Sequence, residues 1–142
     1  MASSPLPASD EDRQEIFRRA TIATLRAVGG RPEQDVSFQD AVLGGNIAKK
    51  PSTADTIQLP HISRGLSTRE MQNIRGAADA AALRLRHHDG TKHRAPPAAV
   101  ARQTFEAIEQ ARCEVYGSRH MAGVRANLDQ RLVQQCADAG CN

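Results

Sequence analysis

Five alanines and one glycine occupy six of the seven positions from 76 to 82, with Asp79 between them, near the middle of this 142-residue chain. Side chains this small let a second helix approach closely, and Gly76 costs a helix ~1 kcal/mol relative to alanine unless a packing contact offsets it. Just upstream, Ser67 and Glu70 have the spacing of a capping box. We therefore predict a helix from Thr68 to about His88 with a narrow face that packs against another helix.

Three further helices are predicted from apolar residues that recur at steps of three and four. The first follows Ser9 as N-cap and ends at Gly29 and Gly30, the next spans about 97 to 116 before Gly117, and the last spans about 120 to 138. The residues expected to face inward are Ile16, Phe17, Ala20, Ala23, Ala27 and Val28 in the first helix, Val100, Ala101, Phe105, Ile108, Ala111 and Val115 in the next, and Met121, Val124, Leu128, Leu132 and Cys136 in the last.

The pattern changes between the first helix and the alanine-rich one. Residues 35–38 and 56–59 alternate between polar and apolar side chains, which is typical of short strands, and we predict that they pair as a ribbon. Aromatic residues make up only 3% of the chain, with no Trp, which favours helices over a sandwich or barrel. The predicted fold is mainly α: a single compact helical domain of about four helices over residues 9–138, with a small two-stranded β-ribbon between helices one and two. Residues 1–8 are expected to be a disordered lead and 139–142 a tail.

Motifs that carry catalysis are missing from the sequence. GGNIAKKPS, residues 44–52, contains glycines and lysines without the GxxxxGK[ST] order that brings backbone amides and a lysine to one phosphate. HExxH, GxSxG and a glycine-rich dinucleotide turn are also missing. We therefore expect neither catalytic nor cofactor-binding residues in this chain.

Positive charge is concentrated in the second half of the chain. Residues 60–131 contain 12 basic and 7 acidic side chains, a net charge of +5, and 16 of the 19 basic residues are arginine. The planar guanidinium suits carboxylate partners. A solvated helical face with ion pairs inside each helix would explain the same composition. Nucleic-acid binding is disfavoured, because the basic residues are not interleaved with stacking aromatics.

Glu106 and Glu109 lie three residues apart on one helix face, a spacing that acid and base catalysis could use. Arg102 and Arg112 flank them at distances of four and three residues. Ion pairs within the helix explain this pattern more simply than catalysis does.

The histidines are the candidate metal ligands. His87, His88, Asp89 and His93 could together ligate zinc, cobalt or nickel. Consecutive side chains on a helix diverge by ~100°, so His87 and His88 cannot face one ion without local unwinding. Histidines at a helix C-terminus also have a structural explanation, because they favour the negative end of the helix dipole.

Cysteine usage and hydropathy indicate a cytoplasmic protein. Three cysteines leave one unpaired in any intramolecular scheme, which suits a reducing compartment. Cys113 is expected to be a buried, inert thiol. No apolar run approaches the ~20 residues needed to span a bilayer, and the N-terminus has no secretory pattern; we therefore expect no membrane partner.

Several segments resemble one known family. RGAADAAALRLRHHD (75–89), TFEAIEQARCEVYGSRHMAGVRANL (104–128) and the strand segments VSF and IQLP are similar to the N-terminal region of the CobT subunit of aerobic cobaltochelatase. The resemblance runs in order from about Phe17 to Leu128. It implies a role in cobalamin biosynthesis, in which the family's complex uses ATP to insert Co(II) into hydrogenobyrinic acid a,c-diamide.

The resemblance also implies partners. In that family an AAA+ ATPase subunit hydrolyses ATP with magnesium, a large subunit holds the tetrapyrrole, and CobT couples the two. CobT continues into a von Willebrand A domain whose DxSxS run binds Mg²⁺, and this sequence has no such run. We therefore expect a fragment or truncated form that alone neither hydrolyses ATP nor inserts cobalt.

Two functional hypotheses follow. The leading one is a non-catalytic docking module whose basic face contacts acidic surface on a partner through Arg84, Arg86, Arg94 and Arg119. The alternative is a cobalt-handling module that uses the segment from His87 to His93.

Overall fold

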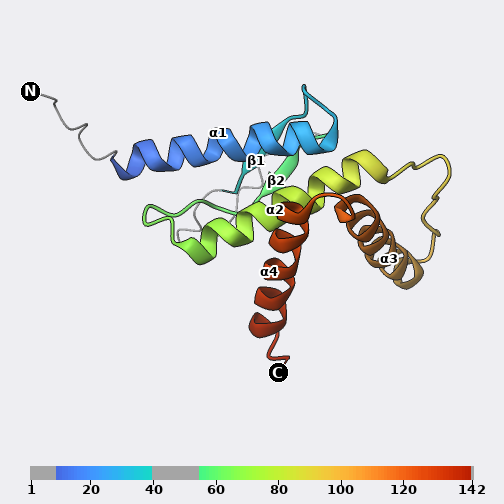
Figure 1. The fold of residues 1–142 in the computed structure, drawn as a ribbon. Helices are drawn as coiled ribbons and strands as arrows, with labels where there is room; N and C mark the ends of the chain where they lie inside the picture. Colours follow the sequence, from blue (N-terminus) through green and yellow to red (C-terminus); the bar gives the residue numbers. More distant parts are fainter. Residues whose placement is uncertain (1–8, 40–54, 142) are drawn as a thin grey trace, which may run out of the picture.

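A computed structural model describes residues 9–39 and 55–141 (Figure 1). Its elements are α1 (Asp10–Gly29), β1 (Val36–Phe38), β2 (Ile57–Leu59), α2 (Thr68–His87), α3 (Ala99–Ser118) and α4 (Ala122–Asp138). The predicted mainly helical fold, with two short strands between the first two helices, is confirmed. The expected lead at 1–8 and the GGNIAKKPS segment at 44–52 lie outside the described residues.

The starts of α1 and α2 follow from their capping residues. The Ser9 hydroxyl accepts a hydrogen bond from the Asp12 amide at 3.1 Å, and the Asp12 carboxylate accepts one from the Ser9 amide at 3.1 Å. This reciprocal pair is a capping box, and α1 ends at Gly29, followed by Gly30 as C-cap in the left-handed region with φ 65°. In α2, Ser67 caps the Glu70 amide at 3.2 Å, but the Glu70 carboxylate binds Ser63 instead. The predicted α2 capping box is therefore only half formed.

The centre of the molecule is α2, which is packed on two sides. On one side Ala78 and Ala82 contact Leu25 of α1 and Leu59 of β2, and Ile74 contacts Phe17. The other side of α2 carries α3 and α4, which both lead away from it in Figure 1. Alanine suits this position, because a helix buried on two faces can let its neighbours approach only where its side chains are short.

The two strands pair in parallel, with Val36 opposite Ile57 and Phe38 opposite Leu59. The ladder is extended at both ends by 2.9 Å hydrogen bonds, from the Ile57 amide to the Asp35 carbonyl and from the Gln39 amide to the Leu59 carbonyl. Parallel pairing cannot be closed by a tight hairpin turn, and in the sequence the two strands are 18 residues apart. The sequence pattern predicted the pair but contained no signal for its orientation.

Helix–helix approach is closest at two glycines. A Cβ atom on Gly76 would lie 2.7 Å from both the Asn127 carbonyl oxygen and Arg131 Cβ of α4, so the predicted narrow face of α2 is confirmed. A Cβ on Gly117 would lie 2.8 Å from His87 Cδ2 and would overlap Leu83. We expected Gly117 to end its helix, but α3 continues to Ser118, and this glycine serves close packing on α2.

The predicted inward faces of three helices are partly wrong. In α1, Ile16, Ala20, Ala23 and Ala27 are exposed, and the buried positions are Phe17, Thr21, Leu25 and Gly29. In α3, Val100, Ile108, Val115, Ala101 and Ala111 are exposed, while Glu109, Cys113 and Ser118 are buried. In α4, Leu132 and Cys136 are exposed and Val124 is buried.

In α3 and α4 the correction has a common physical cause. Both helices approach α2 closely, at Gly117 against Leu83 and at Gly76 against Arg131, and close approach selects small or hydrogen-bonded side chains at the contact rather than bulky apolar ones. The α2–α4 contact shows this, since the Asn127 amide donates to the buried Asp79 carboxylate at 2.7 Å. Burial raises the pKa of Asp79. Within the part of the chain that the structure describes, no helix is both long and apolar enough to cross a membrane.

Candidate functional site

A groove of about 640 Å³ lies between α3 and α4. Both helices pack on α2, and a short turn at residues 119–121 joins them. The groove is lined by Gln110, Ala111, Glu114, Val115, Ser118 and Arg119 from α3 and the turn, and by Arg125, Leu128, Asp129, Arg131, Leu132 and Gln135 from α4.

Large apolar side chains of α3 and α4 meet solvent, two of them within this groove. Within it, Val115 is 64% exposed and Leu132 is 59% exposed. Other large apolar side chains of the same two helices are also exposed, namely Val100, Ile108, Tyr116 and Val133. These six residues, here called the exposed apolar set, leave α3 and α4 with unburied faces that a partner could cover.

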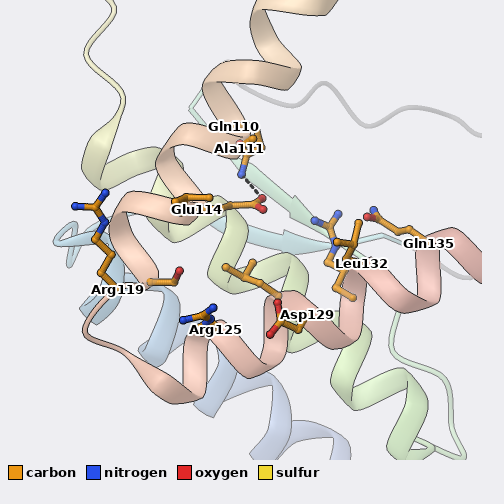
Figure 2. Close-up of a pocket in the computed structure, with 12 residues that line it drawn as sticks. Gln110, Ala111, Glu114, Arg119, Arg125, Asp129, Leu132 and Gln135 are labelled. Atoms are coloured by element: carbon orange, nitrogen blue, oxygen red, sulfur yellow. Dashed lines mark hydrogen bonds between the residues drawn. The ribbon is translucent and has the colours of Figure 1, made fainter.

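Some polar side chains of the groove have hydrogen-bond partners within the protein. Figure 2 shows Glu114 reaching from α3 into the groove, with Asp129, Leu132 and Gln135 presented by α4. Gln110 donates to the Glu114 carboxylate at 2.7 Å and to the Ala80 carbonyl of α2 at 3.1 Å. Glu114 is therefore already held by its own helix.

Three arginines line the groove against two carboxylates. Arg119 sits with its guanidinium carbon 5.5 Å from the centre of the Tyr116 ring, whereas Arg125 and Arg131 take part in none of the ion pairs found among the described residues. Unpaired guanidinium groups beside an apolar floor favour a partner with acidic side chains next to its apolar ones.

A buried ionic cluster fixes α3 to the end of α2. Glu109, only 4% exposed, accepts hydrogen bonds from Arg112 Nε at 2.8 Å and from an Arg112 terminal nitrogen at 2.7 Å, and lies 2.8 Å from His88 Nδ1. Arg112 also donates to the His87 carbonyl at 2.8 Å. The bonds from Arg112, and then from His88, hold the pKa of Glu109 well below its usual range. The predicted pairing of Glu109 with Arg112 is confirmed. The Glu109 carboxylate holds α3 against the end of α2.

The second predicted pair, Arg102 with Glu106, is wrong. Arg102 turns back to the preceding loop and donates to the Pro97 carbonyl at 3.1 Å and the Pro96 carbonyl at 3.3 Å. Glu106 binds Arg84 of α2 instead. The interhelical partner wins because α2 brings a guanidinium to the face of α3 that carries Glu106.

The candidate metal ligands point to different surroundings. His88 binds Glu109, while the His87 ring makes an edge contact with Tyr116 at 5.1 Å between ring centres. His93 lies in the following loop, where its amide donates to the Asp89 carbonyl at 2.9 Å. Over residues 9–39 and 55–141, no group of three His, Cys, Asp or Glu side chains is placed to hold a metal ion.

The four arginines of the predicted basic face are not equivalent. Arg84 is paired with Glu106, and Arg86 donates to the Val28 carbonyl of α1 at 3.0 Å. Arg94 is exposed in the loop before α3, and Arg119 lines the groove. Arg119 is thus the member of this set that borders the hollow a partner could enter.

Cys113 has no exposed surface, as expected. Burial, and then the negative charge of Glu109, raises the pKa of its thiol, so the unreactive protonated form is favoured. All three cysteines are unpaired, and Cys136 and Cys141 are exposed.

Sequence reasoning missed the groove because it assigned the bulky residues of α3 to the core. A usable signal was present: Glu109, Cys113 and Gly117 recur every four residues and so share a face of α3 that is small or polar. Such a face can approach α2 closely, as Gly117 does at Leu83 and His87, and it leaves the bulky residues of α3 outside.

A model of one protein family, described as "Cobalamin biosynthesis protein CobT", matches residues 11–142 of the chain. No solved structure matches the chain.

Proposed function

The chain belongs to the CobT family of cobalamin biosynthesis proteins, and from this we propose that it is a non-catalytic docking module of a cobaltochelatase. In this proposal it supports ATP-dependent insertion of Co(II) into hydrogenobyrinic acid a,c-diamide, with an AAA+ ATPase subunit and a large tetrapyrrole-binding subunit as partners. ATP, magnesium and cobalt are used by the complex rather than held by this chain. We place the reaction in the cytoplasm, which the three unpaired cysteines favour.

The observation that carries the proposal is the exposed apolar set on α3 and α4. Its members are between 56% and 77% exposed, although a helix normally buries its apolar stripe. Exposed apolar side chains of this kind, two of them in a groove, are typical of a surface that a partner covers. The buried ionic cluster behind α3 supports docking, since it holds the helix rigidly before any partner arrives.

The groove best fits an amphipathic helix of the AAA+ subunit. Apolar anchors at helical spacing would contact Val115, Leu128 and Leu132, which is the helix-in-groove mode of recognition. Acidic residues beside those anchors would meet Arg125 and Arg131. The sequence predicted docking through a basic face alone. In the groove, apolar contact supplies affinity and the arginines supply selectivity.

The test measures association of the chain with the purified AAA+ subunit by calorimetry, with and without ATP. Val115→Glu places a charge in the groove, and Ile16→Glu places one on α1, where the wild-type residue has the same exposure of 64%. We expect Val115→Glu to abolish association and Ile16→Glu to preserve it, and high salt to weaken binding without removing it. Equal effects of the two substitutions would contradict docking through this groove.

The alternative function is cobalt handling by His87, His88 and His93. It would need His88 to leave Glu109 and His87 to leave Tyr116. Calorimetric titration with Co(II), comparing wild type with the His87→Ala/His88→Ala/His93→Ala variant, separates the two functions. Equal weak heats in both proteins would remove this alternative.

A further inference from the structure

A second hollow, of about 350 Å³, lies where the C-terminal end of α2 meets the turn between α3 and α4. Its lining includes Arg86, His87, Tyr116, Arg119, His120 and Met121, and no carboxylate. The hollow therefore combines two guanidinium groups and two imidazoles with an aromatic ring and a thioether. Its volume lies within the range of small-molecule sites, ~300–1,000 Å³.

The two guanidinium groups are held in place and remain able to donate. One terminal nitrogen of Arg86 binds the Val28 carbonyl at 3.0 Å, which leaves most of its five N–H groups for another acceptor. Arg119 rests over Tyr116 at 5.5 Å, an arrangement that orients a guanidinium without using its donors. Neither arginine takes part in an ion pair among the described residues.

The other groups around the hollow also lack a negative partner. Burial, and then the charges of Arg86 and Arg112, lowers the pKa of His87, so its imidazole is neutral near pH 7 and offers one N–H donor. Met121, at the rim, is the residue before the first turn of α4, and that turn has neither a capping side chain nor an acidic residue. The partial positive charge of this helix start adds to the field of the arginines.

We propose that this hollow binds a small organic anion that carries carboxylate groups, with Arg86 and Arg119 pairing the carboxylates. Planar carboxylates match the guanidinium fork in a bidentate geometry, while Tyr116 and Met121 provide an apolar wall for the body of the molecule. An anion here would neutralise charge that nothing in the described chain offsets. The site goes beyond docking through the groove, which does not require a bound small molecule.

The test is a titration of the chain with tricarballylate, a compact tricarboxylate, followed by calorimetry and by NMR of the histidine side chains at constant ionic strength. We expect saturable binding, a rise in the pKa of His87 on binding, and chemical-shift changes at His120. Arg119→Gln should weaken binding about tenfold, as expected for the loss of one charge-assisted hydrogen bond. Arg19→Gln, which removes the same charge from the exposed surface of α1, should leave affinity unchanged.

Three outcomes would overturn the proposal: binding that does not saturate, equal weakening by Arg119→Gln and Arg19→Gln, or displacement of tricarballylate by an equal concentration of inorganic phosphate. Arg86→Gln is a secondary variant, because losing the bond to Val28 could loosen α1. Arg119 is exposed, so Arg119→Gln should not disturb folding, and weakened binding in this variant reports on the site itself. Val115 lines the groove and not this hollow, so loss of partner docking in Val115→Glu with tricarballylate binding intact would separate the two sites.

Discussion

Glu109 shows how a charged residue can be a packing residue. Its carboxylate is buried against Arg112 and His88, and its pKa is lowered from 4.5. A carboxyl group with a lowered folded-state pKa adds stability above its unfolded pKa, and this stability is lost as pH falls towards the folded value. The ionised form is therefore part of the folded structure at neutral pH.

We predict that Glu109→Gln lowers the free energy of unfolding at pH 7, and that the deficit shrinks as pH falls below about 4.5. Urea denaturation of both proteins between neutral pH and pH 3 measures this. Glu11→Gln on the exposed first turn of α1 serves as the control. A deficit that stays constant over the range would show that the charge of Glu109 contributes nothing.

Gly76 tests the close contact between α2 and α4. Gly76→Ala should lower the free energy of unfolding by about 1–3 kcal/mol, because the new methyl group would meet the Asn127 carbonyl and Arg131. Gly123→Ala is the matched control, since a Cβ there meets no atom within 4 Å, and we expect a gain of up to ~1 kcal/mol. Thermal or denaturant unfolding gives both values, and stabilisation by Gly76→Ala would contradict the contact.

At the scale of elements, α3 reverses the usual relation between hydrophobicity and burial. Its inner face contains Glu109, Cys113 and Gly117, and its outer face contains Ile108 and Val115. The helix is held by hydrogen bonds and close approach to α2. Its bulky residues are therefore available to a partner.

Packing on α2 and binding of a partner can be tested separately by truncating one residue at the α2–α3 contact and one on the outer face of α3. Leu83→Ala, at a fully buried position facing Gly117, should lower the free energy of unfolding by about 2–5 kcal/mol. Val115→Ala should change it by less than about 0.5 kcal/mol yet weaken association with the AAA+ subunit. Denaturation and calorimetry on the same samples decide this, and a large stability loss in Val115→Ala would place that residue in the core.

For the whole molecule, we expect α2 to be the most stable helix, because it lies at the centre. Amide hydrogen exchange should be slowest in α2, which is buried on two sides, and faster in the first turn of α3, where residues 99–104 are exposed. Exchange mass spectrometry on the isolated chain can measure this. Addition of the AAA+ subunit should slow exchange in α3 and α4. If α1 exchanged more slowly than α2, the proposed packing order would be wrong.

The sequence by itself determined the elements and the family. Helix boundaries follow from Ser9, Ser67 and Gly30, because capping and left-handed turns depend on neighbouring residues, and the narrow face at Gly76 follows from side-chain size. Only the tertiary structure decided that the strands pair in parallel, that Glu106 binds Arg84, and that Ile108 and Val115 face outward. These outcomes depend on which surface α2 offers to its neighbours, and a helical period can identify an apolar stripe without stating what will cover it.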